Sequence, residues 1–227
     1  MAHVDSMDKV IETYFAAVTR ETFTYKGKTY EPKPLQIRPH IFRGFTCPAK
    51  CGACCPRFSL DYLPEEKKPY DALTKRTVEL NGKQYRILSD MQKDHEEHYC
   101  RNLDLQTGRC GIHGVHPFSC DFELIRFMIS RKDPDAPNRL TQKLYGRKWA
   151  MMKVDGTLGT LCAMTPPDAD TTSEVVRKLK RLKQWVEHFG LKHCIDEIIA
   201  WAETGPHDEP LNLDVTRGRV AARRRIQ

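Results

Sequence analysis

A dense group of cysteines is the part of this sequence best suited to chemistry. Four thiols fall within nine residues, at Cys47, Cys51, Cys54 and Cys55. Four more follow at wider spacing, at Cys100, Cys110, Cys120 and Cys162. Thiolates are soft ligands that suit zinc ions and iron–sulfur clusters, so this density predicts a metal centre rather than a catalytic thiol.

The spacing of the cysteines differs from that of an ordinary zinc ribbon, which has two pairs with two residues inside each. Cys47 and Cys51 enclose three residues, and Cys54 and Cys55 are adjacent. Adjacent side chains diverge and rarely fit one tetrahedral ion, so one of this pair is expected to serve a second metal or a polynuclear centre. The eight thiols could fill two four-thiol sites, or one cluster plus a second centre.

The ninth cysteine, Cys194, is expected to be a core residue. Ile198 and Trp201 follow it at helical spacing, which places all three on one apolar face of a predicted helix. We therefore exclude Cys194 from the predicted ligands.

Four histidines lie close enough to the cysteines to be considered as ligands. His113 and His116 flank the late cysteines, and either could replace a thiolate, but a supporting or surface position is favoured. His95 and His98 lie on a polar segment, and surface positions are favoured there too.

Composition indicates a soluble globular protein in a reducing, cytoplasmic compartment. The 227 residues suit one domain with or without a small appendage, and 40% hydrophobic with 30% charged residues suits a modest core. No apolar run approaches the roughly 20 residues of a membrane span. The start, Met1 to Ser6, lacks the features of an export signal, and an odd number of cysteines argues against a complete disulfide framework.

The formal charge of +7 is concentrated in two places, the run Arg177 to Lys183 and the C-terminal tail. The tail arginines are Arg217, Arg219, Arg223, Arg224 and Arg225. The favoured interpretation is a solvated helix face and a tail that aids solubility. The alternative is that the tail contacts nucleic acid or an acidic protein partner. No membrane partner is expected.

The N-terminal half predicts one helix and two hairpins. Apolar residues at helical spacing predict a helix over Ser6 to Thr19, capped by Asp5 or Ser6. Lys26-Gly27 and Asn81-Gly82 each lie between short strand-like runs, and both pairs suit the positive φ angles of a tight turn.

The stretches around the late cysteines read mainly as loops and short strands. Pro64 to Pro69 is expected to be an exposed, charged loop. A turn at Thr107-Gly108 would bring Cys100 and Cys110 into one neighbourhood. Phe122 to Ile129 is interpreted as a strand, followed by a second polar and apolar stretch over Leu140 to Trp149.

The C-terminal part predicts a pair of helices. Thr171 with Glu174 resembles a capping box at the start of a helix. A long apolar stripe follows, and Gly190 is a suitable residue to end this helix. A second helix is expected from Lys192 to about Glu203. We therefore predict an α+β fold with a cysteine-rich, metal-binding domain over 1–165, a helical hairpin appendage over 166–206, and a weakly ordered basic tail over 207–227.

The cysteine motifs resemble a known family. They comprise Cys51-Gly52-Ala53-Cys54-Cys55, Cys100 with Leu103, Gly108-Arg109-Cys110-Gly111-Ile112-His113, Pro117 with Cys120, and Cys162. Together they are similar to the CxxCxxCC-type family of zinc- or iron-chelating domains, although the first interval holds three residues where the family name implies two. The same region resembles the cysteine-rich part of flagellin lysine N-methylases, a family linked to an iron–sulfur cluster. This resemblance implies a cluster as a candidate cofactor, but it does not imply methylation by this chain.

Two function classes follow. The first is an iron–sulfur or other thiolate-bound iron protein, either redox-active or part of a modifying enzyme. The second is a zinc-stapled, non-enzymatic module that binds nucleic acid or an acidic protein. The adjacent cysteines and the resemblance favour iron, whereas the net charge and the lack of a recognisable catalytic motif favour the module.

Overall fold

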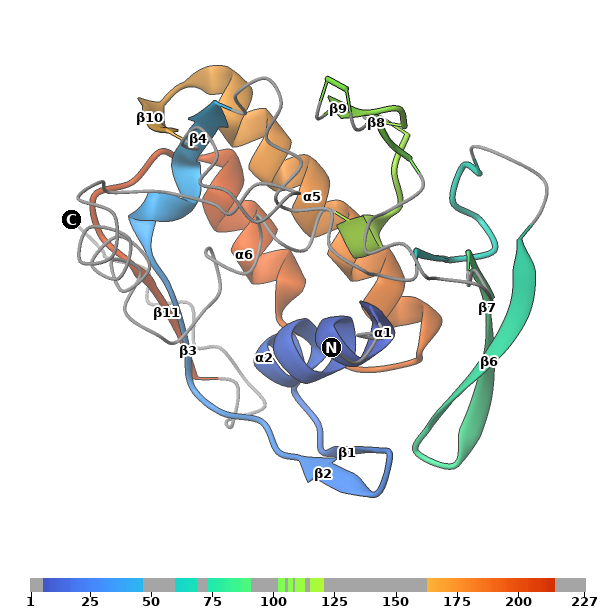
Figure 1. The fold of residues 1–227 in the computed structure, drawn as a ribbon. Coiled ribbons are helices and arrows are strands. Elements are labelled where there is room, and N and C mark those ends of the chain that lie inside the picture. Colours follow the sequence, from blue (N-terminus) through green and yellow to red (C-terminus); the bar gives the residue numbers. More distant parts are fainter. Residues whose placement is uncertain are drawn as a thin grey trace, which may run out of the picture.

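The computed structural model describes residues 6–46, 60–68, 73–90, 102–104, 106–107, 109–112, 115–120 and 163–214. The α-helices lie near the two ends of these residues, most of the short antiparallel strands lie between them, and the predicted α+β class is confirmed (Figure 1). No helix in the described ranges is long and apolar enough to cross a membrane. The interpretations of residues 94–98, 122–129 and 140–149 concern stretches outside those ranges.

The described chain begins with a continuous helical stretch. It consists of α1 (Ser6–Lys9), the π-helical segment η1 (Val10–Phe15) and α2 (Ala16–Val18). The predicted helix is confirmed, although its π-helical middle was not foreseen, and Thr19 is already extended. Ser6, expected as a cap, donates its hydroxyl to the carboxylate of Asp61.

Both predicted hairpins are confirmed. In the first, β1 (Phe23–Tyr25) pairs with β2 (Lys28–Tyr30). The turn between them has φ angles of 47° at Lys26 and 73° at Gly27, as a two-residue hairpin turn requires.

The second hairpin is longer and belongs to a three-stranded sheet. β6 (Thr74–Leu80) pairs with β7 (Lys83–Ser89), and β5 (Asp61–Tyr62) lies on the other edge of β7. Its turn residue Asn81 accepts a 2.7 Å hydrogen bond from the backbone N–H of Thr24 and donates one of 3.0 Å to the Thr24 carbonyl. The tip of the second hairpin is thereby joined to the first.

Two further sheets join distant parts of the chain. β3 (Leu35–Ile37) pairs with β11 (Leu211–Leu213), and β4 (Arg43–Thr46) pairs with β10 (Ala163–Pro167), the 3₁₀ segment η2 (Pro39–Phe42) lying between β3 and β4. Residues 211–213 lie in the stretch that was expected to be weakly ordered. The structure instead gives them a paired strand.

The long C-terminal helix α5 (Ala169–His188) begins one turn earlier than predicted. Asp168, not Thr171, is the N-cap, because the Asp168 carboxylate accepts the backbone N–H of Thr171 at 2.7 Å. Glu174, the other half of the predicted capping box, pairs instead with Arg177. The predicted stop is confirmed, since Gly190 has a φ of 65°.

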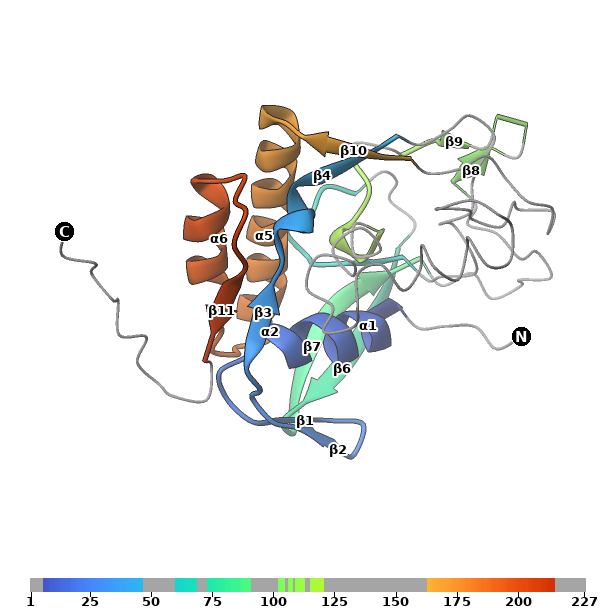
Figure 2. The same cartoon turned by 90° about the vertical axis from the view of Figure 1, so that its left-hand side faces the viewer.

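The second C-terminal helix, α6 (Ile195–Glu203), packs beside α5 (Figures 1 and 2). It begins at Ile195 rather than Lys192, with Cys194 as its N-cap residue. The backbone N–H of Cys194 donates to the carbonyl of Val18 at 2.9 Å. This bond fixes the start of α6 against the end of the N-terminal helical stretch.

One hydrophobic core contains side chains from α5, α6, the N-terminal helical stretch and the hairpins. Phe15 and Phe189 meet edge-to-face with ring centroids 5.4 Å apart, and the Trp185 side chain in the last turn of α5 is fully buried. This core has members on both sides of the predicted boundary at residue 165.

Candidate metal centre

Two of the eight proposed ligands, Cys110 and Cys120, lie in the described residues, and both are partly exposed. The other six, Cys47, Cys51, Cys54, Cys55, Cys100 and Cys162, lie outside them. Within the described ranges, no three His, Cys, Asp or Glu side chains gather closely enough to hold a metal ion. The described residues instead show how the segments next to several of these cysteines are positioned.

Cys110 lies at the end of a short hairpin. β8 (Leu103–Asp104) pairs with β9 (Arg109–Cys110), and Leu103 stands opposite Cys110. The predicted turn is confirmed: the Asp104 carboxylate accepts the Thr107 hydroxyl at 2.6 Å and the Gln106 N–H at 2.8 Å. These bonds, first that of the Thr107 side chain, lower the pKa of Asp104. The hairpin thus places Cys110 opposite Leu103, which follows Cys100 closely in the sequence. That the thiols of Cys100 and Cys110 lie together stays a prediction.

Cys120 lies on a helical turn over residues 118–120 that begins in the hydrophobic core. The Phe118 ring is fully buried and contacts Tyr14 and Trp185, with centroids 6.2 and 5.9 Å away. Ser119 is 2% exposed, whereas Cys120 is partly exposed. The turn therefore has a buried base and a more accessible thiol.

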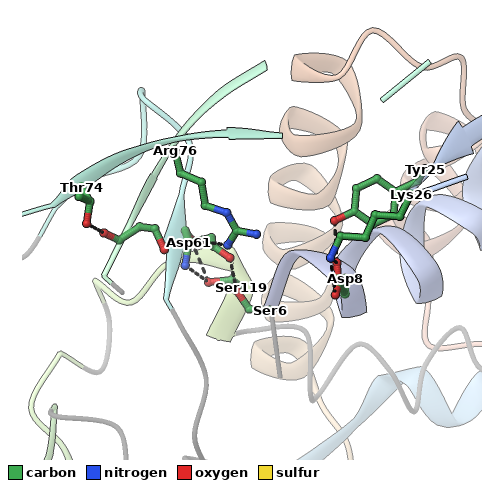
Figure 3. Close-up of polar contacts among 9 residues, drawn as sticks. Ser6, Asp8, Tyr25, Lys26, Asp61, Thr74, Arg76 and Ser119 are labelled. Atoms are coloured by element: carbon green, nitrogen blue, oxygen red, sulfur yellow. Dashed lines mark hydrogen bonds and ion pairs between the residues drawn. The ribbon is translucent and has the colours of Figure 1, made fainter. Parts of the chain in front are cut away.

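Ser119 is bonded to the backbone of Asp61 in both directions. Its hydroxyl donates to the Asp61 carbonyl at 2.9 Å and accepts the Asp61 N–H at 3.2 Å (Figure 3). The fully buried Asp61 carboxylate receives the Ser6 hydroxyl and lies 3.5 Å from the Arg76 guanidinium. A buried carboxylate needs such partners, and they tie β5 to α1 and β6. The two Ser119 bonds to the Asp61 backbone join β5 to the Cys120 turn.

Glu66 forms a second link to the same turn. Its carboxylate accepts the Phe118 N–H and an Arg181 N–H, both at 2.9 Å, and the Leu63 N–H at 2.9 Å. The same Arg181 nitrogen donates to the carbonyl of His116 at 2.8 Å. One carboxylate therefore joins residues 60–68, the segment before Cys120 and helix α5.

Sequence reasoning missed this link because it assigned residues 64–69 to an exposed loop. The Glu66 side chain is only 10% exposed. No periodic pattern marks a single buried carboxylate whose partners lie 52 and 115 positions away. Its partners could be identified only from the three-dimensional contacts.

The β4–β10 ladder lies next in sequence to the first and last proposed ligands, Cys47 and Cys162. Its last pair is Thr46 opposite Ala163. Thr46 is the residue before Cys47, and Ala163 is the residue after Cys162. Figures 1 and 2 both place this ladder and the β8–β9 hairpin at the same, upper end of the fold.

Cys194 is confirmed as a core residue. Its side chain is fully buried at the start of α6, and burial raises the pKa of its thiol to about 12. A thiol in this environment stays protonated at neutral pH, whereas metal ligation and nucleophilic attack require the thiolate.

The basic run on α5 is paired with acidic side chains. The pairs are Arg177–Glu174, Lys178–Glu174, Lys180–Glu203, Arg181–Glu66 and Lys183–Asp196. The expected solvated face is therefore only partly correct, because Lys178 is 2% exposed and Arg181 contacts the Cys120 segment. Such a neutralised run is poorly suited to contact phosphates.

Residues 46–139 match the family model CxxCxxCC, described as "Putative zinc- or iron-chelating domain". The predicted resemblance is confirmed. The matched residues extend from Thr46 to Arg139, so they include every proposed ligand except Cys162. No curated protein and no solved structure matches the chain. The family match supports binding of zinc or iron, and the soft thiol donors of the segment fit both metals.

Proposed function

We propose that this protein holds a thiolate-bound iron centre, with an iron–sulfur cluster favoured over zinc. The proposed ligands are Cys47, Cys51, Cys54, Cys55, Cys100, Cys110, Cys120 and Cys162. Support comes from the family match and from the adjacent pair Cys54 and Cys55, which suits a polynuclear centre better than one tetrahedral ion. A redox function is part of this proposal, because an iron–sulfur cluster, when bound, supplies one-electron transfer.

The pairing of β4 with β10 is the observation that carries the proposal. Opposite Cα atoms in an antiparallel ladder are about 4.5–5.5 Å apart, and consecutive Cα atoms about 3.8 Å. Since Thr46 stands opposite Ala163, the Cα atoms of Cys47 and Cys162 can be at most roughly 13 Å apart. Cysteines 115 positions apart in sequence are thus available to one centre, and the thiols need not form unrelated sites.

Anaerobic purification of the full chain tests this proposal. We expect a brown protein with iron and acid-labile sulfide in similar amounts, and loss of both in Cys54→Ser and Cys120→Ser variants. Cys194→Ala is the control and should retain the wild-type metal content. A colourless protein with stoichiometric zinc would contradict the iron centre, and a protein without zinc or iron would contradict metal binding altogether.

A zinc-stapled binding module is the second candidate. One observation disfavours α5 and so favours the tail as its contact surface: the basic run on α5 pairs with acidic residues. The tail arginines come after β11, the last strand in the described residues. Binding through the tail would be mostly electrostatic and would weaken steeply with salt. We suggest comparing the intact chain with one ending at Asp214, which retains β11, for affinity to duplex and single-stranded nucleic acid at two salt concentrations. Equal binding by both chains would exclude the tail.

A further inference from the structure

We propose that Ser119 and Glu66 are positioning residues for the metal centre, holding the turn that carries Cys120 in the geometry for metal binding. This inference rests on the proposed metal centre and on the assignment of Cys120 to it. Neither residue is a ligand in this proposal. Ser119 acts through bonds to the backbone of Asp61, and Glu66 acts through a bond from the backbone N–H of Phe118, two residues before Cys120.

The Ser119 hydroxyl both donates to and accepts from the backbone of Asp61. The Ser119 hydroxyl uses its proton and a lone pair on the carbonyl and N–H of one residue, Asp61. Both Ser119 and Asp61 are nearly or fully buried, at 2% and 0% exposure. A two-point contact of this kind fixes both the separation and the orientation of β5 and the turn, and the next residue along is Cys120.

Glu66 holds the residues that lead into the same turn. Its carboxylate binds the Phe118 N–H directly, and through Arg181 it reaches the carbonyl of His116. Hydrogen bonds to a charged group are stronger than neutral ones, and a largely buried pair is little screened by solvent. Residues 116–119 are thus attached at two backbone positions, the His116 carbonyl and the Phe118 N–H, and through the Ser119 hydroxyl.

The residues that hold the Cys120 turn lie close in the sequence to the first cysteine group. Asp61 and Glu66 lie shortly after the first cysteine group, which ends at Cys55. Fixing the Cys120 turn to residues 61–66 therefore limits the distance between the late and the early cysteines. Ligands that are held in place before the metal binds lose less conformational freedom, and removal of outer partners of ligands typically weakens metal binding by roughly 10–100-fold.

The test compares Ser119→Ala and Glu66→Gln with two matched controls in the full-length, metal-depleted protein. Ser89→Ala removes a hydroxyl that is 1% exposed on the strand opposite Asp61. Glu197→Gln weakens the partly buried pair with Arg20, which joins α6 to the end of the N-terminal helical stretch. Zn²⁺ affinity is measured by competition with a chromophoric chelator, and Co²⁺ serves as the spectroscopic probe, because the intensity of its thiolate charge-transfer band reports the number of bound thiolates.

We expect Zn²⁺ binding roughly 10–100-fold weaker and a diminished Co²⁺ thiolate band in Ser119→Ala and Glu66→Gln. Both controls should match the wild type, and Ser119→Thr, which keeps the hydroxyl, should restore the Co²⁺ spectrum. Arg181→Lys keeps the charge, but its shorter side chain and compact ammonium cannot place an N–H donor in the same position between Glu66 and His116. It should therefore give a weaker effect in the same direction even where Glu66→Gln does not fold.

Two results would overturn the inference while leaving the metal centre intact. One is wild-type affinity and spectrum in Ser119→Ala, Glu66→Gln and Arg181→Lys. The other is an equal loss in the two controls, which would indicate general destabilisation. A wild-type protein that binds neither Zn²⁺ nor Co²⁺ and that contains no iron after anaerobic purification would overturn the proposed centre and this inference together.

Discussion

Glu66 and Arg181, 115 positions apart in the chain, form an ion pair of 2.9 Å beside the segment that carries Cys120. Their side chains are 10% and 18% exposed, so water screens this pair far less than it screens the surface pairs of α5. Helix α5 is thereby connected to the cysteine-rich part of the chain by charge as well as by apolar packing.

Removal of Arg181 should lower stability much more than removal of a neighbouring arginine. Arg181→Ala leaves the Glu66 carboxylate largely buried without its cation and should lower the free energy of unfolding by about 2 kcal/mol. Arg177→Ala on the same helix breaks a pair whose partners are both 45% exposed, and should cost less than about 0.5 kcal/mol. Urea unfolding followed by Trp fluorescence measures both, and equal losses would contradict the prediction.

The cap at Asp168 predicts a dependence of stability on acidity. Hydrogen bonds from the Thr171 hydroxyl and N–H lower the pKa of Asp168 below its ordinary 3.8. A lowered pKa in the folded state means that the carboxylate stabilises the fold above about pH 3.8 and that this contribution disappears as the pH falls below it.

Asp168→Ala should therefore lower the midpoint of thermal unfolding at pH 7, and the difference from wild type should shrink on acidification. Asp168→Asn keeps a capping oxygen and should retain most of the stability at pH 7. A difference between Asp168→Ala and wild type that is constant from pH 7 to pH 3 would rule out the cap as its source.

Cys194 predicts a dependence on alkaline pH with the opposite sign. Burial raises the pKa of its thiol from 9.0 to about 12, so between these values the unfolded chain loses the proton and the folded chain keeps it. The contribution is complete below pH 9 and is lost as the pH rises toward 12. Cys194→Ala should lower the free energy of unfolding by about 1 kcal/mol at neutral pH because packing is lost. When unfolding is measured from about pH 8 to about pH 10.5, the stability of this variant should fall less than that of the wild type. Parallel curves would contradict the buried thiol.

Removal of the metal should affect the chain unevenly. The core around Trp185 contains side chains from α5, α6 and the N-terminal helical stretch, and it has no described contact that requires a metal. The sequence predicts turns and no long apolar stripe in the segments that carry the cysteines, so metal binding should supply much of their folding free energy. Anaerobic chelation followed by limited proteolysis should give cleavage between residues 47 and 120 while α5 and α6 stay protected. Loss of protection in α5 and α6 to the same extent would contradict this.

Much of the local structure could be predicted because single residues determine it. Lys26-Gly27 and Asn81-Gly82 adopt positive φ angles, and Gly190 ends α5 as expected. The capping box was misplaced by one turn, since Asp168 and Thr171 are both good capping residues and only the folded backbone shows which one accepts the N–H. A local pattern cannot decide between neighbouring caps of similar quality.

The long-range structure could not be predicted. β4 and β10 are four and five residues long and lie more than a hundred positions apart, too short and too distant for any periodic signal. Glu66 read as an exposed loop residue because of its charge, whereas two of its three partners, Phe118 and Arg181, lie on distant segments. The ligand set itself stays a prediction, since six of the eight thiols lie outside the described residues.

The pairing of β3 with β11 has a consequence for synthesis of the chain on the ribosome. Leu35–Ile37 emerges early, but its partner Leu211–Leu213 is translated about 175 residues later. At a translation rate of roughly 5–20 residues per second, the hydrogen-bonding edge of β3 stays without β11 for roughly 9 to 35 seconds. A chain that stops before Leu211 carries this open edge permanently, so truncated products should be the forms most prone to aggregation or capture by chaperones.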